Sequence, residues 1–166
     1  MSVQPKLRVH LECGDARVDF EGDADEVFKA FTEFLNKIYP SFEVARKLIF
    51  IPDIIGLSEE IAGLIEIAPE GPMLVLGREL PADETICLAL LGSDIGNRLG
   101  KLSKASLSLD ELAKVTGKAH KTIMNQLPWM IDEGLIERVG KGEYRITSLG
   151  IKRAQNVIKD YKASRK

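Results

Sequence analysis

Residue types that usually carry chemistry are scarce in this chain of 166 residues, which holds two cysteines, two histidines and one tryptophan. Cys13 and Cys87 lie far apart and form no CxxC motif, so the sequence predicts neither a disulfide framework nor a zinc ribbon. His10 stands close to Cys13, but the other histidine, His120, lies far along the chain. Because zinc in proteins takes several protein ligands, we expect no metal site.

Long apolar runs and phosphate-binding loops are also missing. The most apolar region, residues 48–68, is interrupted by Pro52, Asp53, Glu59 and Glu60, so it cannot supply the roughly 20 apolar residues of a membrane-spanning helix. The N-terminal residues MSVQPKLRVHLE lack the apolar core of a secretory signal. The glycines are isolated, and no serine or cysteine stands in a recognisable catalytic motif. We therefore expect a cytoplasmic protein without a cofactor, and neither an enzyme nor a membrane protein.

The net charge of −2 hides a difference between the two halves of the chain. Residues 1–80 contain 8 Lys and Arg against 15 Asp and Glu, which gives −7. Residues 81–166 contain 15 Lys and Arg against 10 Asp and Glu, which gives +5. A basic surface attracts phosphate and an acidic one repels it, so any nucleic-acid contact is expected in the second half. Scattered solvated charge is the plain alternative.

The first half begins with a predicted β-hairpin over residues 7–21, which turns at Gly14 and Asp15. A glycine at the first turn position suits the positive φ of a type II′ turn. Setting Cys13 opposite Ala16 pairs Leu11 with Val18 and Val9 with Phe20 on one face, and Glu12 with Arg17, His10 with Asp19 and Arg8 with Glu21 on the other. Each pair joins two apolar side chains or a basic to an acidic one, which favours this register. The sequence therefore indicates a structural role for His10.

Three helices are predicted to follow, over about 24–39, 42–50 and 58–67. Asp23 and Glu26 form a capping-box pattern at the start of the first helix, and Ser58 is the predicted cap of the third. Residues 68–72 are predicted to form a loop, and residues 73–76 a short strand. The hairpin and helices over 1–72 then make a small acidic α+β domain. Such a domain could pair with its own copy, hold a partner protein or sense a metabolite.

The second predicted domain, over 73–166, is mostly helical. Its first helix starts near Pro81 and is apolar nearly all round, so we expect it to be buried, with a break at Gly92. Ser108 and Glu111 form a capping box that opens a short helix, and Gly117 ends that helix. The remaining predicted elements are a helix over 119–133, strands over 135–139 and 143–147 around a Gly-Lys-Gly tip, and a last helix from about Leu149.

This order of elements resembles the winged helix-turn-helix domains of bacterial and archaeal transcription regulators of the MarR and PadR kind. The residues that carry the resemblance are LDELAKVTG over 109–117, KTI over 121–123, DEGLI over 132–136 and YRITSLG over 144–150. It covers about 81–166 and implies an α+β protein with a C-terminal winged helix-turn-helix domain. In similar families terminal helices often mediate dimerisation, which implies a homodimer; a last helix that only closes its own domain is the alternative.

The resemblance also assigns contacts with DNA. The second helix of such a domain lies in the major groove, with its outward N-terminal residues against base edges. In this sequence those residues are His120, Lys121, Met124 and Asn125, with Gln126 at the flank. Lys118, and Lys141 with Arg138 or Arg145 on the wing, are expected to contact phosphates. The alternatives are a solvated helix face and an ordinary exposed turn.

Two residues inside the predicted recognition helix depart from the family pattern. Pro128 removes the hydrogen bond to the carbonyl of Met124, at a cost of about 3 kcal/mol, so we expect a shortened or bent helix. Trp129 lies beside the core stripe. It is either a buried packing residue, which we favour, or a partly exposed anchor for a protein partner.

The sequence thus predicts a homodimeric transcription regulator that binds double-stranded DNA. It would read the major groove with the helix over 119–133 and contact phosphates with the wing over 137–145. The alternative is a winged-helix adaptor in a larger nucleic-acid or cell machinery complex, which binds protein through the acidic domain or the region of Trp129 and does not bind DNA specifically.

Overall fold

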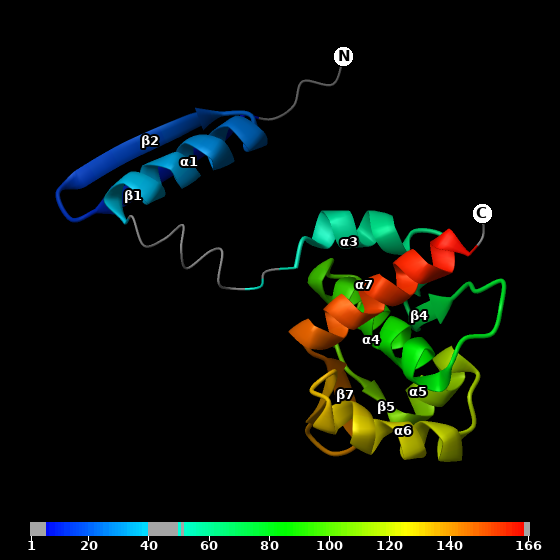
Figure 1. The fold of residues 1–166 in the computed structure, drawn as a ribbon. Coiled ribbons are helices and arrows are strands. Elements are labelled where there is room, and N and C mark those ends of the chain that lie inside the picture. The colour runs from blue at the N-terminus through cyan, green and yellow to red at the C-terminus, as the bar shows by residue number, and fades with distance from the viewer. Residues whose placement is uncertain (1–5, 40–49, 51, 165–166) are drawn as a thin grey trace. The chain divides into compact units, whose positions relative to one another are not determined.

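The computed structural model describes residues 6–39, 50 and 52–164, and it shows a mixed α+β protein with small antiparallel sheets (Figure 1). The chain divides into two compact units, Met1–Ile51 and Pro52–Lys166, which are called unit 1 and unit 2 below. This division differs from the boundary predicted between residues 72 and 73, because residues 52–72 pack with the second unit. Within the described residues, no helix is long and apolar enough to cross a membrane.

Unit 1 consists of a β-hairpin and one helix. Strands β1 (Leu7–Cys13) and β2 (Ala16–Gly22) pair in the predicted register, with Cys13 opposite Ala16 and Leu7 opposite Gly22. Gly14 has φ 58° and is followed by a residue with negative φ, as a type II′ turn requires. Helix α1 (Ala24–Ile38) opens with the predicted capping box of Asp23 and Glu26. The hairpin register and this cap are confirmed.

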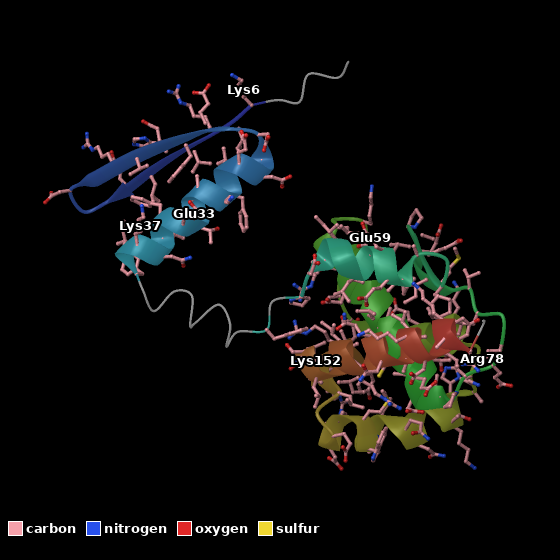
Figure 2. All side chains as sticks on the ribbon, turned by 45° about the horizontal axis from the view of Figure 1, so that its top comes forward. Lys6, Glu33, Lys37, Glu59, Arg78 and Lys152 are labelled. Carbon is pink, nitrogen blue, oxygen red and sulfur yellow. The ribbon has the colours of Figure 1, made fainter. Side chains whose placement is uncertain are left out.

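Aromatic contacts hold α1 against the hairpin. The ring of Phe20 meets those of Phe31 and Phe34 edge-on, at centroid distances of 6.1 and 5.8 Å. Val27 is buried, whereas Glu33 and Lys37 are exposed on the same helix (Figure 2). The predicted helix over 42–50 lies outside the described residues except for its last position.

Unit 2 begins with a helix whose bounds differ from the prediction of 58–67. Helix α3 runs over Ile54–Ile61, and its cap is Asp53, whose carboxylate accepts a hydrogen bond from the backbone N–H of Gly56 at 3.1 Å. Ser58 does not cap it; its hydroxyl donates to the carbonyl of Ile54 inside the helix. The aspartate that stands before the first apolar turn is therefore the start signal.

A second β-hairpin follows where the sequence predicted the end of a helix, a loop and a strand over 73–76. Strand β3 (Ile65–Ala68) pairs with β4 (Gly71–Leu74), and Ile65 lies opposite Leu74. The alternation in the segment Ile-Glu-Ile-Ala has the period of a strand, and Ile65 is buried while Glu66 is exposed. Such a short apolar segment suits a helix or a strand, and its packing on the next helix selects the strand.

That next helix, α4 (Ala82–Arg98), is the centre of unit 2 (Figure 1). Every residue from Thr85 to Gly96 is buried, which confirms the predicted burial. The predicted break at Gly92 is wrong, because the helix continues through it. A Cβ atom at Gly92 would lie 2.8 Å from side-chain atoms of Ile65 and Pro72. The glycine therefore serves a close approach of the β3–β4 hairpin, and burial on all sides offsets its low helix propensity.

The remaining elements follow the predicted order. They are β5 (Leu107–Ser108), α5 (Leu109–Thr116), α6 (His120–Asp132), β6 (Ile136–Val139), β7 (Glu143–Ile146) and α7 (Ser148–Ala163), and their sheet has the order β5-β7-β6. The capping box of Ser108 and Glu111 is present, and Gly117 ends α5 with φ 67°. Both predictions are confirmed.

Helix α7 buries its apolar stripe inside unit 2. Ile151, Ala154, Ile158 and Tyr161 are all buried. The hydroxyl of Tyr161 accepts a hydrogen bond from the backbone N–H of Gly77 at 2.6 Å, and Arg78 lies over its ring. The apolar stripe of this helix is therefore covered within its own unit.

Candidate functional site

Helix α6 has one buried and one exposed face. Ile123, Leu127 and Met130 are buried against the rest of unit 2. The exposed residues are His120, Lys121, Thr122, Met124, Asn125, Pro128, Trp129, Ile131 and Asp132. Because an α-helix repeats about every 3.6 residues, Lys121, Asn125 and Pro128 share the face that turns away from the core. Four of the five residues predicted to meet bases are exposed, and Gln126 is half-buried.

The first turn of α6 directs uncapped backbone groups outward. Its N-cap residue, Ala119, has no side chain that can accept a hydrogen bond from the helix. The first N–H groups of a helix lack partners within the helix and carry its positive partial charge. This end of α6 also holds Lys121, whereas the other end carries Asp132 and Glu133. The helix is therefore electropositive at its start and acidic at its end.

Three residues predicted to contact DNA have acidic side chains as partners. His120 Nε2 is 2.8 Å from Asp110 Oδ1, and Lys118 Nζ donates to Glu79 Oε1 at 2.6 Å. On the β6–β7 hairpin, Arg145 donates to Glu137 from both Nε and Nη2. These acids lower the net positive charge that an approaching phosphate would meet.

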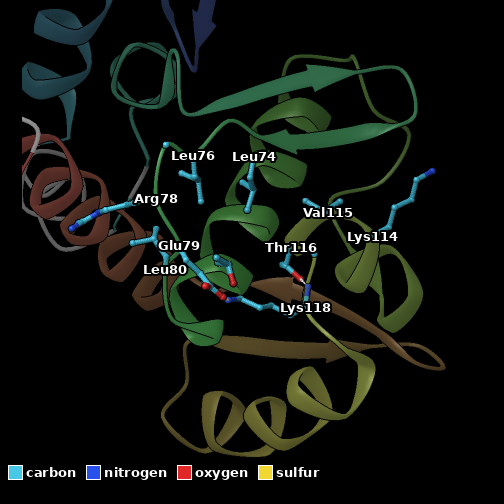
Figure 3. A pocket seen from close by; sticks show the side chains of 12 residues that line it. Leu74, Leu76, Arg78, Glu79, Leu80, Lys114, Val115, Thr116 and Lys118 are labelled. Atoms are coloured by element: carbon cyan, nitrogen blue, oxygen red, sulfur yellow. Dashed lines mark hydrogen bonds and ion pairs between the residues drawn. The ribbon is translucent and has the colours of Figure 1, made fainter.

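Lys118 turns toward the segment before α4, as Figure 3 shows. Its side chain is 17% exposed and lies at a cavity of about 550 Å³ between residues 74–80 and the end of α5. The hydrogen bond from Lys118 holds the pKa of Glu79 below its usual value. In this arrangement Lys118 fixes the turn before α6 and is not directed outward with Lys121.

The tip of the β6–β7 hairpin carries the remaining basic residues. Gly140 and Gly142 have φ of 65° and 76°, a conformation that favours glycine. Lys141 between them is exposed, as is Arg138. Within the part of the chain that the structure describes, neither of these two side chains, nor Lys121, forms an ion pair. They are the basic groups of this region that are free to meet a ligand.

A cluster of hydrogen bonds and ion pairs around Lys104 connects this hairpin to α5. Lys104 Nζ donates to Glu111 at 2.9 Å and to Glu143 at 2.8 Å, and the hydroxyl of Ser106 also donates to Glu143. Glu143 lies on β7 and Glu111 at the start of α5. The cluster therefore sets the hairpin in a defined position beside the helix pair.

Pro128 does not end α6, which continues to Asp132. Trp129 is 46% exposed, so the expectation of a buried packing residue is wrong. Met124 is 57% and Ile131 38% exposed. Met124, Pro128 and Ile131 follow one side of α6 at helical spacing, whereas Trp129 lies on the other side of its exposed face.

Sequence reasoning missed several residues of this surface. Thr122 is exposed on the first turn of α6, although the sequence had only marked it as part of the family pattern. Asp110 and Glu79, which bind predicted contact residues, carry no local signal, because their partners are 10 and 39 residues away. The chain fold alone brings these two pairs together. Glu137 lies opposite Arg145 in the β6–β7 hairpin, so the hairpin register is the signal that could have indicated this pair.

The described residues were compared with the requirements of a metal site and of a reactive thiol. No group of three or more His, Cys, Asp or Glu side chains within 6–39, 50 and 52–164 is placed to hold a metal ion. Burial raises the pKa of the Cys87 thiol to about 12, which keeps it protonated and weakly nucleophilic.

Comparison with known proteins gave no match, either to a protein family, to a curated protein or to a solved structure.

Proposed function

We propose that this protein binds double-stranded DNA as a homodimeric transcription regulator of the winged helix-turn-helix kind. The observation that carries the proposal is the exposed start of α6, where Lys121, Met124 and Asn125 stand opposite a buried stripe. Helix α5, the tight turn at Gly117 and the basic hairpin tip at Lys141 follow the order of that family. In this reading α6 is the recognition helix and the β6–β7 hairpin is the wing.

The proposed contacts follow from side-chain chemistry. Asn125 can make a paired contact to adenine, and Lys121 can reach guanine or a phosphate. Lys141 and Arg138 on the wing supply phosphate contacts, which position the protein without reading sequence. The uncapped N–H groups at the start of α6 add a second site for a phosphate oxygen. The acidic end of the helix, Asp132 and Glu133, would point away from the duplex.

The test is fluorescence-anisotropy titration with duplexes selected from genomic fragments, at two salt concentrations. Replacing Lys121, Asn125 and Lys141 together by Ala should weaken binding at least about tenfold and lower the salt dependence by about two phosphate contacts. Lys159→Ala is the control for the loss of one charge, because Lys159 is exposed on α7, a helix that lies apart from α6 (Figure 1). Equal binding by the parent and the triple variant, or affinity no better than for random duplex, would refute the proposal.

One observation favours a second candidate, a winged-helix adaptor that binds protein. Trp129 is 46% exposed, and tryptophans are enriched at the centres of protein interfaces. If this candidate holds, Trp129→Ala abolishes capture of one stoichiometric partner and leaves duplex binding unchanged. If Trp129 instead packs on the DNA backbone, the same variant weakens duplex binding.

A further inference from the structure

The free edge of β1 is self-complementary, and this property points to a specific partner. Within the described residues β1 pairs with β2 alone, so its other edge presents unpaired backbone groups. An unpaired edge is a template for another strand. Its residues Leu7 to Cys13 read apolar, Arg8, apolar, His10, apolar, Glu12 and Cys13. The basic and acidic residues lie symmetrically about His10.

The hairpin turn determines which backbone groups face that edge. In a hairpin closed by a two-residue turn, the residues that flank the turn exchange both backbone hydrogen bonds, and the pattern alternates from there. Cys13 and Ala16 flank the turn, so Cys13, Leu11 and Val9 direct their N–H and C=O groups toward β2. The N–H and C=O groups of Arg8, His10 and Glu12 therefore point outward.

We propose that two copies of this chain pair through antiparallel β1 strands about a two-fold axis at His10. In that register His10 meets His10 of the second copy and Arg8 meets its Glu12, and all three residues are those with outward backbone groups. Val9 then meets Leu11 on the apolar face. Both requirements of an antiparallel ladder, hydrogen-bond parity and matched side chains, are fulfilled by the same register.

The edge of β2 fits a second copy less well. Its outward residues are Arg17, Asp19 and Glu21, so the same symmetry about Asp19 would set two aspartates opposite each other. Like charges directly opposite are destabilising. An imidazole can lose its charge near neutral pH, whereas a carboxylate cannot. Moreover, His10 already lies 2.7 Å from Asp19 and 3.4 Å from Glu12, so carboxylates surround the axis.

Unit 1 also has an apolar face that a second copy would extend. Leu7 on β1 is 43% exposed, and Val9 and Leu11 are only half-buried beneath one helix. A two-fold axis perpendicular to the sheet gives four strands with both α1 helices on the same apolar face. Four strands with helices on one face form a more stable layer than a two-stranded hairpin, which is marginal in water. Helix α7 is not available for this role, because its stripe is buried in unit 2.

This inference deepens the pairing contained in the proposed function, but its test needs no DNA. Oligomeric state is measured on the full chain by analytical ultracentrifugation. His10→Pro removes an outward N–H from β1, and Asp19→Pro removes the corresponding one from β2. Each variant also removes one partner of the His10–Asp19 contact, so the two variants should destabilise the hairpin itself to a similar extent.

The parent is expected to be a dimer, His10→Pro to raise the dissociation constant about 100-fold, and Asp19→Pro to stay dimeric. In the dimer the amide hydrogen of His10 should also exchange more slowly than that of Asp19. A monomeric parent at up to about 1 mM overturns the proposal. So does loss of the dimer in Asp19→Pro alone, or its retention in both variants.

If both proline variants lose the dimer, a pair of charge-reversal variants tests whether β1 forms the interface. Arg8→Glu and Glu12→Arg each place like charges across the axis in their own homodimer, but a mixture of the two restores opposite charges. Association about tenfold tighter in the mixture than in either variant alone supports the β1 interface, and no difference overturns it. A dimer that survives without sequence-specific DNA binding would refute the proposed function and leave this interface intact.

Discussion

The two units of this protein achieve burial in different ways. In unit 2 a central helix, α4, is buried along its whole middle, and the surrounding helices and hairpins cover it. In the described part of unit 1, Val27 is the only apolar side chain that is buried, and the aromatic residues around it stay half-exposed. A small unit buries too little surface to be very stable by itself. Unit 2 therefore has the burial of an independent domain, whereas unit 1 buries little apolar surface, which the proposed pairing through β1 would increase.

The largest expected effect tests the tight packing of unit 2. A Cβ atom at Gly150 would lie 2.0 Å from the carbonyl oxygen of Leu135, a backbone atom that cannot rotate away. Gly150→Ala should therefore lower the free energy of unfolding of unit 2 by about 3 kcal/mol. Fluorescence of Trp129, the single tryptophan, follows unit 2 during urea unfolding.

The matched control is Asn156→Ala, an exposed position on the same helix, which should change the free energy by less than about 0.5 kcal/mol. A tolerated Gly150→Ala would mean that α7 is not packed as closely on the β6–β7 hairpin as the structure shows.

A smaller effect is expected in unit 1. Phe20→Ala removes both edge-on contacts with Phe31 and Phe34, and should cost about 2 kcal/mol because the ring is only half-buried. The amide resonances of residues 7–38 should collapse toward unfolded positions, while the unfolding curve of Trp129 stays unchanged. Phe28→Ala is the control, since Phe28 is 62% exposed. A parallel shift of the Trp129 curve would show that the units unfold together.

Local signals made the hairpin register and the helix caps predictable from sequence. The alternating charges from Arg8 to Glu21 allow one register, and Asp23 with Glu26 and Ser108 with Glu111 are short-range capping pairs. The helix predicted over 58–67 failed because Ile65 and Ile67 suit a buried helix turn as well as a strand. The break at Gly92 failed because a glycine that meets a neighbouring hairpin looks, in sequence, like a helix terminator.

The sequence was enough to predict which face of α6 is exposed. It was not enough to predict which of the basic residues of the candidate site have acidic partners. Helical spacing places Lys121 and Asn125 opposite the buried stripe, and both are exposed. The contacts of Lys118 with Glu79 and of His120 with Asp110 depend on how the segment before α4 and the start of α5 fold back. Such contacts have no periodicity, so a sequence gives the basic residues without their acidic neighbours.

The smallest expected effect is a difference in the pH dependence of the two units. In unit 2, hydrogen bonds from Lys104 and Ser106 lower the pKa of Glu143 below its ordinary 4.5. Burial opposes ionisation of Glu111, but hydrogen bonds from Ser108 and Lys104 outweigh it, so the pKa of Glu111 is also lowered. Their stabilisation is present above pH 4.5 and is lost as the pH falls through the lowered values.

In unit 1 the sign is opposite. Hydrogen bonds to Asp19, and then to Glu12, raise the pKa of His10 above 6.5, against a smaller opposing effect of Arg8. That stabilisation is complete below pH 6.5 and is lost as the pH rises through the raised value. Both effects should be small, because solvent screens exposed pairs.

Urea unfolding as a function of pH, at concentrations where the chain is monomeric, measures both effects. For unit 2, followed by Trp129 fluorescence, Glu143→Gln should reduce the loss of unfolding free energy at acid pH. Glu133→Gln is the charge-matched control. For unit 1, followed by its amide resonances, His10→Gln should reduce the change in unfolding free energy with pH near neutrality. If Glu143→Gln leaves the free energy of unfolding at acid pH unchanged, the contacts of Glu143 with Lys104 and Ser106 add nothing to the stability of unit 2.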